Sequence, residues 1–188
     1  MFIQTEQTPN PQTLKFLPGK VVMADGTAFY QSVNEAGDSP FARRLFSVEG
    51  VEGVFFGSDF ITITKNVGYD WQVLKPSVLG GIIDHFNSDD KTVEKIDNNN
   101  PTKGDEKNDD DSDIVKQIKE LLDTRVRPAV AMDGGDIIYN NFEDGIVYLK
   151  MQGACSGCPS STATLKMGIE NMLKHYIPEV LEVRPVDA

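Results

Sequence analysis

A strongly acidic tract that is poor in apolar residues divides this chain of 188 residues into two parts. Between residues 87 and 113 there are 10 acidic and 4 basic side chains, and the tract includes the polar run DNNNPTKGDEKNDDDSD. Such a composition buries too little apolar surface to offset the entropy that is lost on ordering. The stretches on both sides are rich in apolar residues. The tract therefore predicts a flexible acidic linker at 87–112, joining one domain at 1–86 to another at 113–188.

The charge of the chain is concentrated in this linker. The net charge is −11, of which residues 87–113 contribute −6 (4 minus 10), residues 1–86 contribute −3 (6 minus 9) and residues 114–188 contribute −2 (8 minus 10). Neither flanking part contains the cluster of Lys and Arg that a nucleic acid or an anionic membrane requires. No apolar run approaches the roughly 20 residues that cross a bilayer. We therefore expect a soluble protein with no nucleic-acid partner and no membrane partner.

The first residues bear on the cellular location. The opening MFIQTEQTPNP has neither the apolar core of a secretory signal nor the Arg-rich and Ser-rich amphipathic pattern of an organellar presequence. This pattern predicts a cytoplasmic protein in a bacterium, or a mitochondrial matrix protein if the chain is the trimmed form of an organellar one. Two cysteines in such a chain do not make a disulfide framework. We expect them to serve chemistry or metal binding.

Hydrophobic periodicity predicts an α/β (α+β) fold in which each part is a small two-layer domain. In the first part, the run VFFGSDFITITK predicts two strands joined by a tight turn. Apolar residues between Trp71 and Phe86 recur on one face of an amphipathic helix. Pro76 lies within that helix and is expected to kink or shorten it.

The second part predicts the order α-β-β-α-β. Its first helix is expected to be capped by Ser112 or Asp113 and to end before Pro128. After a turn at MDGGDI, the segment IIYNNFEDGIVYLKMQ predicts two strands around Glu-Asp-Gly, and VLEVRPV predicts the last strand. The second helix has a predicted buried stripe formed by Leu165, Ile169, Met172, Leu173 and Tyr176.

Both cysteines lie in the short loop GACSGCP, between a predicted strand and a helix that is expected to begin at Pro159. Proline is favoured at the first helical position, so Cys158 is expected at the helix cap. Free N–H groups and the positive end of the helix dipole there favour the thiolate, which binds metals and attacks disulfides. Cys155 and Cys158 are therefore the candidate site residues.

These residues alone leave three interpretations open. Two thiolates can hold a metal from one side, but tetrahedral zinc and the common clusters take about four ligands. The chain has no third cysteine, and we expect His85 and His175 to be half-exposed packing residues of helices. A symmetric dimer would turn two cysteines into four. The order strand-CxxC-helix also occurs in thioredoxin-like oxidoreductases, although early in that fold, and a pair of buried cysteines is the third interpretation.

Two segments resemble a known family. The stretch RVRPAVAMDGGDIIYNNFEDGIVYLKMQGACSGCPSSTATLKMGIENMLKHYIPEV closely resembles the C-terminal domain of the NifU-like (Nfu) iron–sulfur proteins, in the DGGD turn and in the GxCxxCPSS loop. The opening TEQTPNPQTLKFLPG resembles the N-terminal domain of the two-domain Nfu proteins. The resemblance implies that Cys155 and Cys158 from each of two subunits bridge a [4Fe-4S] cluster in a homodimer.

The resemblance therefore predicts an iron–sulfur cluster scaffold or carrier with no catalytic turnover of its own. Its expected partners are apo iron–sulfur client proteins and the cluster assembly machinery. The N-terminal part has no chemical motif, so we expect it to dock donors or clients. The alternatives are a thiol–disulfide oxidoreductase that uses the CxxC pair, and a zinc-bridged dimer with a structural role.

Overall fold

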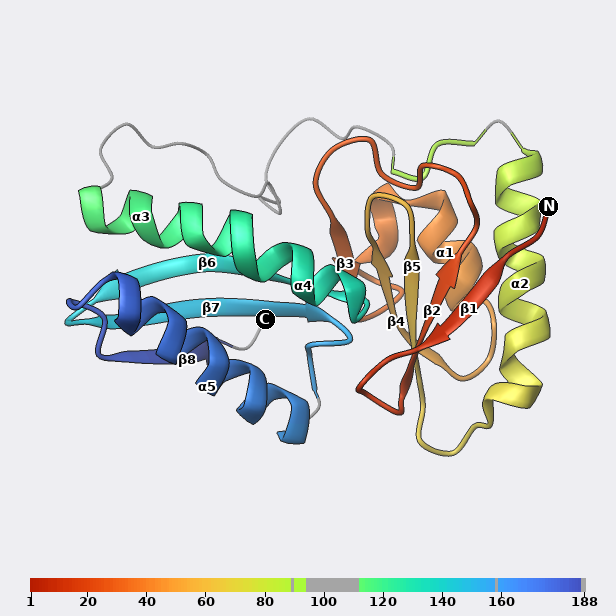
Figure 1. The fold of residues 1–188 in the computed structure, drawn as a ribbon. Helices are drawn as coiled ribbons and strands as arrows, with labels where there is room; N and C mark the ends of the chain where they lie inside the picture. The colour runs from red at the N-terminus through yellow and green to blue at the C-terminus, as the bar shows by residue number, and fades with distance from the viewer. Residues whose placement is uncertain (89, 94–111, 158, 187–188) are drawn as a thin grey trace. The chain divides into compact units, whose positions relative to one another are not determined.

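The computed structural model describes residues 1–88, 90–93, 112–157 and 159–186. The chain forms two compact units, Met1–Thr102 and Lys103–Ala188, and each unit has its own sheet and hydrophobic core (Figure 1). Both units combine helices with one sheet, so the expected two-layer α+β architecture is confirmed. Most of the predicted linker lies outside the described ranges. In those ranges no helix is long and apolar enough to span a bilayer.

The N-terminal unit is built on a five-stranded antiparallel sheet in the order β1-β2-β5-β4-β3. Its strands are β1 (Gln4–Gln7), β2 (Thr13–Leu17), β3 (Ala28–Tyr30), β4 (Val51–Phe56) and β5 (Ile61–Lys65). The two strands predicted in VFFGSDFITITK are β4 and β5, which pair with one irregularity in register near Gly53. Strand β1 pairs with β2 and forms one edge of the sheet.

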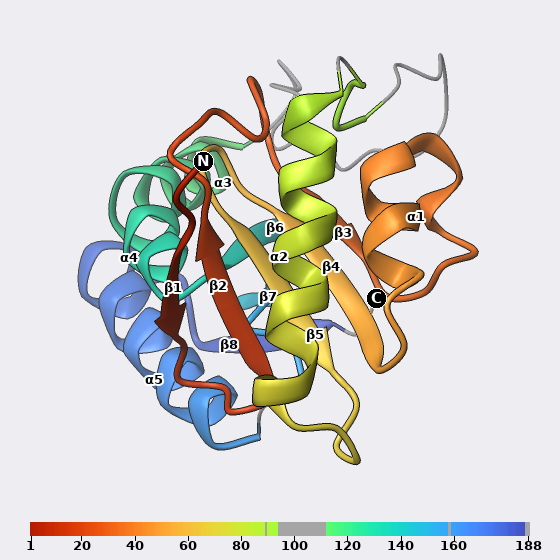
Figure 2. The ribbon, with the colours of Figure 1, turned by 90° about the vertical axis from the view of Figure 1, so that its right-hand side faces the viewer.

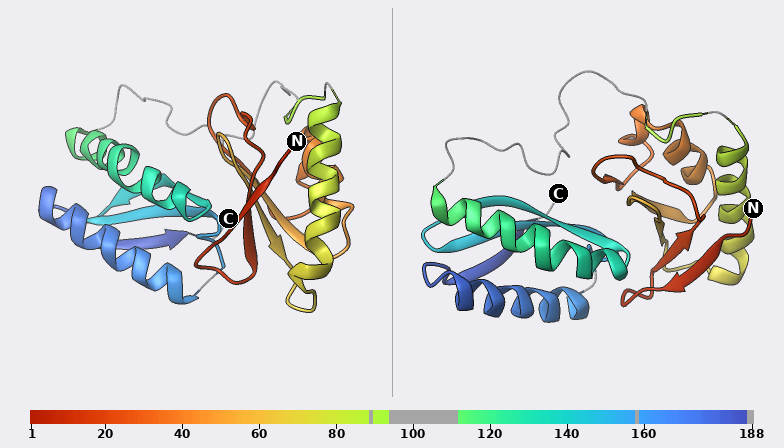
Figure 3. Two further views of the ribbon diagram at one scale, coloured as in Figure 1. Left: turned by 45° about the vertical axis from the view of Figure 1, so that its right-hand side comes forward. Right: turned by 45° about the horizontal axis from the view of Figure 1, so that its top comes forward.

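Two helices, α1 (Pro40–Phe46) and α2 (Trp71–Asn87), pack on one face of this sheet, and a short 3₁₀ turn, Ala36–Asp38, precedes α1 (Figure 2, Figure 3). Their buried side chains join those of alternate strand residues in one apolar core. Pro76 lies inside α2, which nevertheless runs for 17 residues, so the expected shortening was wrong. Pro76 and Gln72 are both exposed, and water can therefore hydrate the carbonyl group that loses its helical N–H partner.

His85, near the end of α2, is a core residue. It was expected to be half-exposed, but only 3% of its surface is accessible. Its ring stacks on Phe41 of α1 with the centroids 3.7 Å apart and the planes nearly parallel. Burial and the nearby positive charge of Arg44 lower the pKa of His85, although Asp90 acts in the opposite direction. The α1–α2 packing therefore contains a neutral imidazole.

The C-terminal unit has the predicted order α-β-β-α-β. Its elements are α3 (Asp113–Leu121), α4 (Arg127–Met132), β6 (Gly135–Glu143), β7 (Ile146–Gly153), α5 (Pro159–Tyr176) and β8 (Glu182–Val186). Strand β7 is central, antiparallel to β6 and parallel to β8. The helices contribute to the same core as the sheet and lie on one of its faces (Figure 1, Figure 3). Tyr176, predicted to be buried, is 47% exposed in the last turn of α5, where the guanidinium of Arg125 lies over its ring.

The helical run before β6 is longer than predicted. Ser112 caps α3 as expected, because its hydroxyl accepts the N–H of Val115. The run was predicted to end before Pro128, and this was wrong. A π-helical turn at Leu122–Val126 separates α3 from α4. Pro128 consequently lies in the first turn of α4, where a missing N–H removes little hydrogen bonding.

Candidate functional site

The cysteine loop connects β7 to α5, as predicted. The N–H of Cys155 donates to the carbonyl of Gln152 at 3.3 Å, and the N–H of Ser156 donates to the carbonyl of Gly153 at 3.1 Å. These bonds turn the chain out of the strand. Gly153 and Gly157 have φ angles of 62° and 76°, a region where a side chain would be strained. The two glycines therefore allow the loop to bend on both sides of Cys155.

Cys155 occupies a tightly packed position beside Gly135, at the end of the core. Its surface is 6% exposed, and it packs with the apolar side chains of the C-terminal unit. A Cβ atom on Gly135 would lie 2.5 Å from the Cys155 Sγ. The neighbouring Gly134 carbonyl accepts the N–H of Ala154 at 3.1 Å, and the Thr162 hydroxyl donates to the Cys155 carbonyl at 3.3 Å. The glycine turn and the first part of α5 thus hold the first cysteine from two sides.

The electrostatic surroundings of Cys155 favour a protonated thiol. Burial raises the pKa of Cys155 to about 12, and the negative charges of Asp133 and Asp136 add to the shift. The helix cap was expected to favour a thiolate at Cys158, but that residue lies outside the described ranges, so this stays a prediction. A buried thiol of high pKa is a poor nucleophile at neutral pH. A metal ion can still displace the proton, because thiolate coordination supplies the compensating positive charge.

Near Cys155 lies an ion pair that was not predicted from the sequence. The Nε and Nη2 atoms of Arg127 donate to the two carboxylate oxygens of Asp136, each at 3.0 Å, and Nη1 donates to Asp123 at 2.9 Å. The side chain of Asp136 is 5% exposed, and its Oδ1 also accepts the N–H of Ile137. Asp136 raises the pKa of Arg127 above its usual range, both by hydrogen bonding and by its charge. The second aspartate of the DGGD turn therefore anchors the turn to α4.

The two histidines belong to other elements than the cysteine loop. His85 is buried in the N-terminal core, and His175 is exposed in the last turn of α5. Among the residues that the structure describes, no group of three or more His, Cys, Asp and Glu side chains gathers in a way that could hold a metal ion. The described residues of one subunit thus do not make a complete ligand set.

Comparisons with known proteins match both parts of the chain. Residues 3–89 match the family model described as scaffold protein Nfu/NifU N terminal, and residues 118–184 match the NifU-like domain. Among solved structures, the NMR structure of a NifU-like protein from Saccharomyces cerevisiae is 25% identical with a TM-score of 0.46. The match covers 51% of this chain and 87% of that one.

Curated relatives match over almost the whole chain. The human protein named NFU1 iron-sulfur cluster scaffold homolog, mitochondrial, is 52% identical over 187 residues, which are 99% of this chain and 72% of that protein. The Drosophila sechellia protein of the same name is 51% identical, and the chain spans 65% of its length. Because two successive domain models match and these relatives share half of the residues, this chain belongs to the two-domain NifU-like (Nfu) family.

Proposed function

We propose that this protein is an iron–sulfur cluster scaffold or carrier, which holds a [4Fe-4S] cluster as cargo between two subunits through Cys155 and Cys158 of each. The main support is the glycine-bounded CxxC loop before α5, in which Cys155 is seated against the DGGD turn. The printed names of the relatives, which call them iron-sulfur cluster scaffold homologs, support the same role.

The dimer follows from the number of ligands. A [4Fe-4S] cluster takes about four thiolates, and the sequence contains two cysteines. A twofold axis beside the loop would supply the other two from the partner subunit. Binding of iron would remove the proton that burial keeps on Cys155, so uptake of the cluster should release protons. A ligand that is readily reprotonated also suits a cluster that must later be released.

The competing proposal is a thiol–disulfide oxidoreductase. Such an enzyme needs one attacking thiolate with a depressed pKa and one resolving cysteine. The environment of Cys155 shifts its pKa in the wrong direction for an attacking residue. That proposal would therefore depend on Cys158 as the nucleophile, whereas a scaffold needs no catalytic turnover. We infer that the protein is not an enzyme.

Partners and location follow from the same role. We propose that the protein receives clusters from the assembly machinery and passes them to apo iron–sulfur proteins. The predicted linker would let the cluster-bearing unit move while the N-terminal unit is docked, which raises the local concentration of the cluster near its acceptor. Because the relatives are named mitochondrial, the mitochondrial location is better supported than the cytoplasmic one.

Single serine variants of the two cysteines test the function. Cys155→Ser and Cys158→Ser each remove two of four thiolates from a symmetric dimer, and a serine hydroxyl is a weaker ligand for cluster iron. Iron and sulfide, measured after anaerobic reconstitution, should fall to background in both variants. Unchanged cluster content in either variant would contradict the shared ligand set. A mixed disulfide trapped by one variant alone, with no cluster in the parent protein, would support the oxidoreductase instead.

A further inference from the structure

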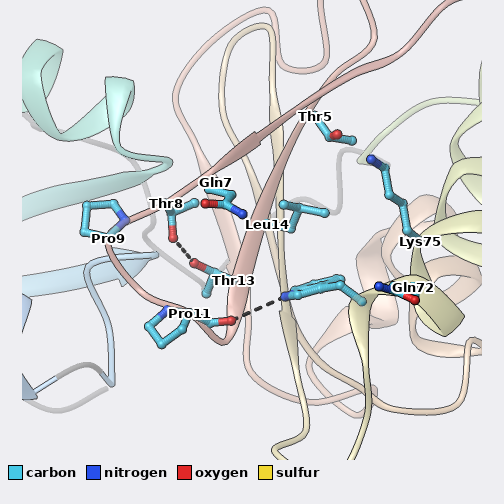
Figure 4. A pocket seen from close by; sticks show the side chains of 10 residues that line it. Thr5, Gln7, Thr8, Pro9, Pro11, Thr13, Leu14, Gln72 and Lys75 are labelled. Carbon is cyan, nitrogen blue, oxygen red and sulfur yellow. Dashed lines mark hydrogen bonds between the residues drawn. The ribbon is translucent and has the colours of Figure 1, made fainter.

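The N-terminal unit contains a pocket that has no part in the proposed cluster binding. It lies between the β1–β2 hairpin and the first turns of α2 and encloses about 550 Å³ (Figure 4). Seven of its ten lining residues belong to the opening segment TEQTPNPQTLKFLPG. A volume of this size is typical of sites that bind a ligand or a few side chains of a partner.

One wall of the pocket is held rigid by the hairpin loop. Asn10 is 4% exposed, and its side-chain oxygen accepts the N–H of Gln12 at 3.0 Å, while its carbonyl accepts the N–H of Thr13 at 3.0 Å. Pro9 and Pro11 restrict the backbone on both sides of this turn. A partner that binds such a wall loses little free energy in ordering the loop.

Trp71, at the start of α2, forms the opposite wall. Its indole Nε1 donates to the carbonyl of Pro11 at 3.3 Å, which ties the helix to the hairpin loop. The ring is half-buried, and the nearly buried side chain of Leu14 lines the pocket beside it. Rigid aromatic side chains in such positions often provide much of the binding energy at protein interfaces.

Lys75 supplies the charge of the pocket. It lies one helical turn after Trp71, and Figure 4 shows its amino group directed toward Thr5 of β1. It is the one charged side chain among the lining residues, and no ion pair or hydrogen bond joins it to another residue of the described ranges. A carboxylate that entered the pocket would therefore meet an ammonium group with no competing partner.

The pocket opens beside the edge of the sheet. Strand β1 pairs with β2 on one side, and on its other side no strand of the described chain follows. Thr5 and Gln7 alternate along β1 and both line the pocket. An extended peptide added to the free edge of β1 would place every second side chain on the same face as these two residues.

We propose that this pocket binds an extended peptide segment of a partner protein. The segment pairs with the free edge of β1, sets an Asp or Glu carboxylate against Lys75, and packs an apolar side chain against Trp71. This gives a location to the docking role of the N-terminal unit and rests on that proposed role. The binding itself requires neither cysteine.

Parallel selection of peptides tests the pocket. A display library of random dodecapeptides is selected on the full-length apo chain and on its Lys75→Gln variant. Peptides enriched on the parent chain should carry an acidic and an apolar residue two positions apart and should lack internal proline. No enrichment, or the same peptides enriched equally on both proteins, would overturn the proposal.

A synthetic copy of the most enriched peptide then locates the site. Trp71 is the single tryptophan, so its fluorescence should change on titration, and the amide signals of Gln4–Gln7 should shift in NMR spectra. Lys75→Gln should weaken binding about fivefold, whereas Lys75→Arg and the control Lys91→Gln should not. Shifts confined to other residues would refute the site, and full binding by an N-methylated peptide would refute pairing with β1. Iron content of the Lys75→Gln variant should be unchanged, which separates this test from that of the scaffold function.

Discussion

Gly135 lies so close to Cys155 that the space a Cβ atom would need is already occupied by the cysteine. A Cβ at Gly135 would stand 2.5 Å from the Cys155 Sγ and 2.8 Å from the carbonyl oxygen of Gln152. Two of these three residues belong to β7 and its loop, and Gly135 begins β6. The DGGD turn thus determines where the first candidate ligand can sit.

Gly135→Ala should therefore destabilise the C-terminal unit and lower its cluster content. Overpacking of this kind costs about 1–3 kcal/mol of unfolding free energy, because the cysteine loop must move to admit the methyl group. Gly168→Ala is the matched control, since a Cβ at this position in α5 would meet no atom within 4 Å apart from its chain neighbours and the backbone of its own helix. Because alanine favours a helix more than glycine does, Gly168→Ala should raise the free energy of unfolding by about 0.5–1 kcal/mol. Urea unfolding followed by circular dichroism, together with iron analysis, tests both variants. Equal cluster content in the two variants would show that the close contact with Gly135 does not position Cys155.

Replacing Arg127 should lower the free energy of unfolding far more than replacing Asp123, its exposed partner. Arg127→Met leaves the carboxylate of Asp136 buried without its bidentate partner, which costs about 3–5 kcal/mol. Asp123→Asn disrupts the other, exposed ion pair of Arg127 and should cost less than about 1 kcal/mol. Unfolding free energies of the two variants provide the comparison. Similar losses would mean that burial of Asp136 contributes little.

The stability of the N-terminal unit should decrease in mild acid because of His85. Its pKa is lowered in the folded state, so below about pH 6.5 the unfolded chain binds a proton that the folded chain does not. The contribution of neutral His85 to the free energy of unfolding is therefore full above that pH, and it decreases as the pH drops toward the pKa of the folded state. Trp71 fluorescence reports unfolding of this unit in the full-length protein.

His85→Phe keeps an aromatic ring against Phe41 and removes the titration. This variant should show a flatter dependence of stability on pH than the parent protein between about pH 7 and pH 5, the range that begins just above the ordinary histidine pKa. A parallel pH dependence in both proteins would show that other groups cause the acid sensitivity.

Dimerisation should depend on the cluster, and the C-terminal unit should be sufficient for both. We expect the apo chain to be largely monomeric and the reconstituted chain to be dimeric, because the partner subunit completes the ligand set. Light scattering on anaerobic samples measures this for the full chain and for the fragment 113–188. A cluster-loaded monomer would exclude shared ligands. Failure of the fragment to take up a cluster would contradict the proposed domain division at 1–86, 87–112 and 113–188.

Much of the fold could be predicted from sequence because its signals are local. The hairpin of β4 and β5, the turn at Gly145 and the cap at Ser112 each depend on residues a few positions apart. The cysteine loop was located in the same way, from the strand before it and the helix that begins at Pro159. Local hydrogen bonding and the periodicity of apolar side chains determine such features, and contacts with distant residues contribute little to them.

Contacts between distant residues were decided by the tertiary structure. The burial of His85 depends on Phe41, which lies 44 positions earlier, and the pocket in the N-terminal unit depends on Trp71 meeting Pro11 across 60 positions. The close approach of Gly135 to Cys155 likewise exists because β6 pairs with β7. The sequence by itself determined the two-part organisation and the CxxC loop, since both follow from local composition and spacing. Which side chains surround that loop, and where a partner can dock, depends on packing between segments that no local pattern connects.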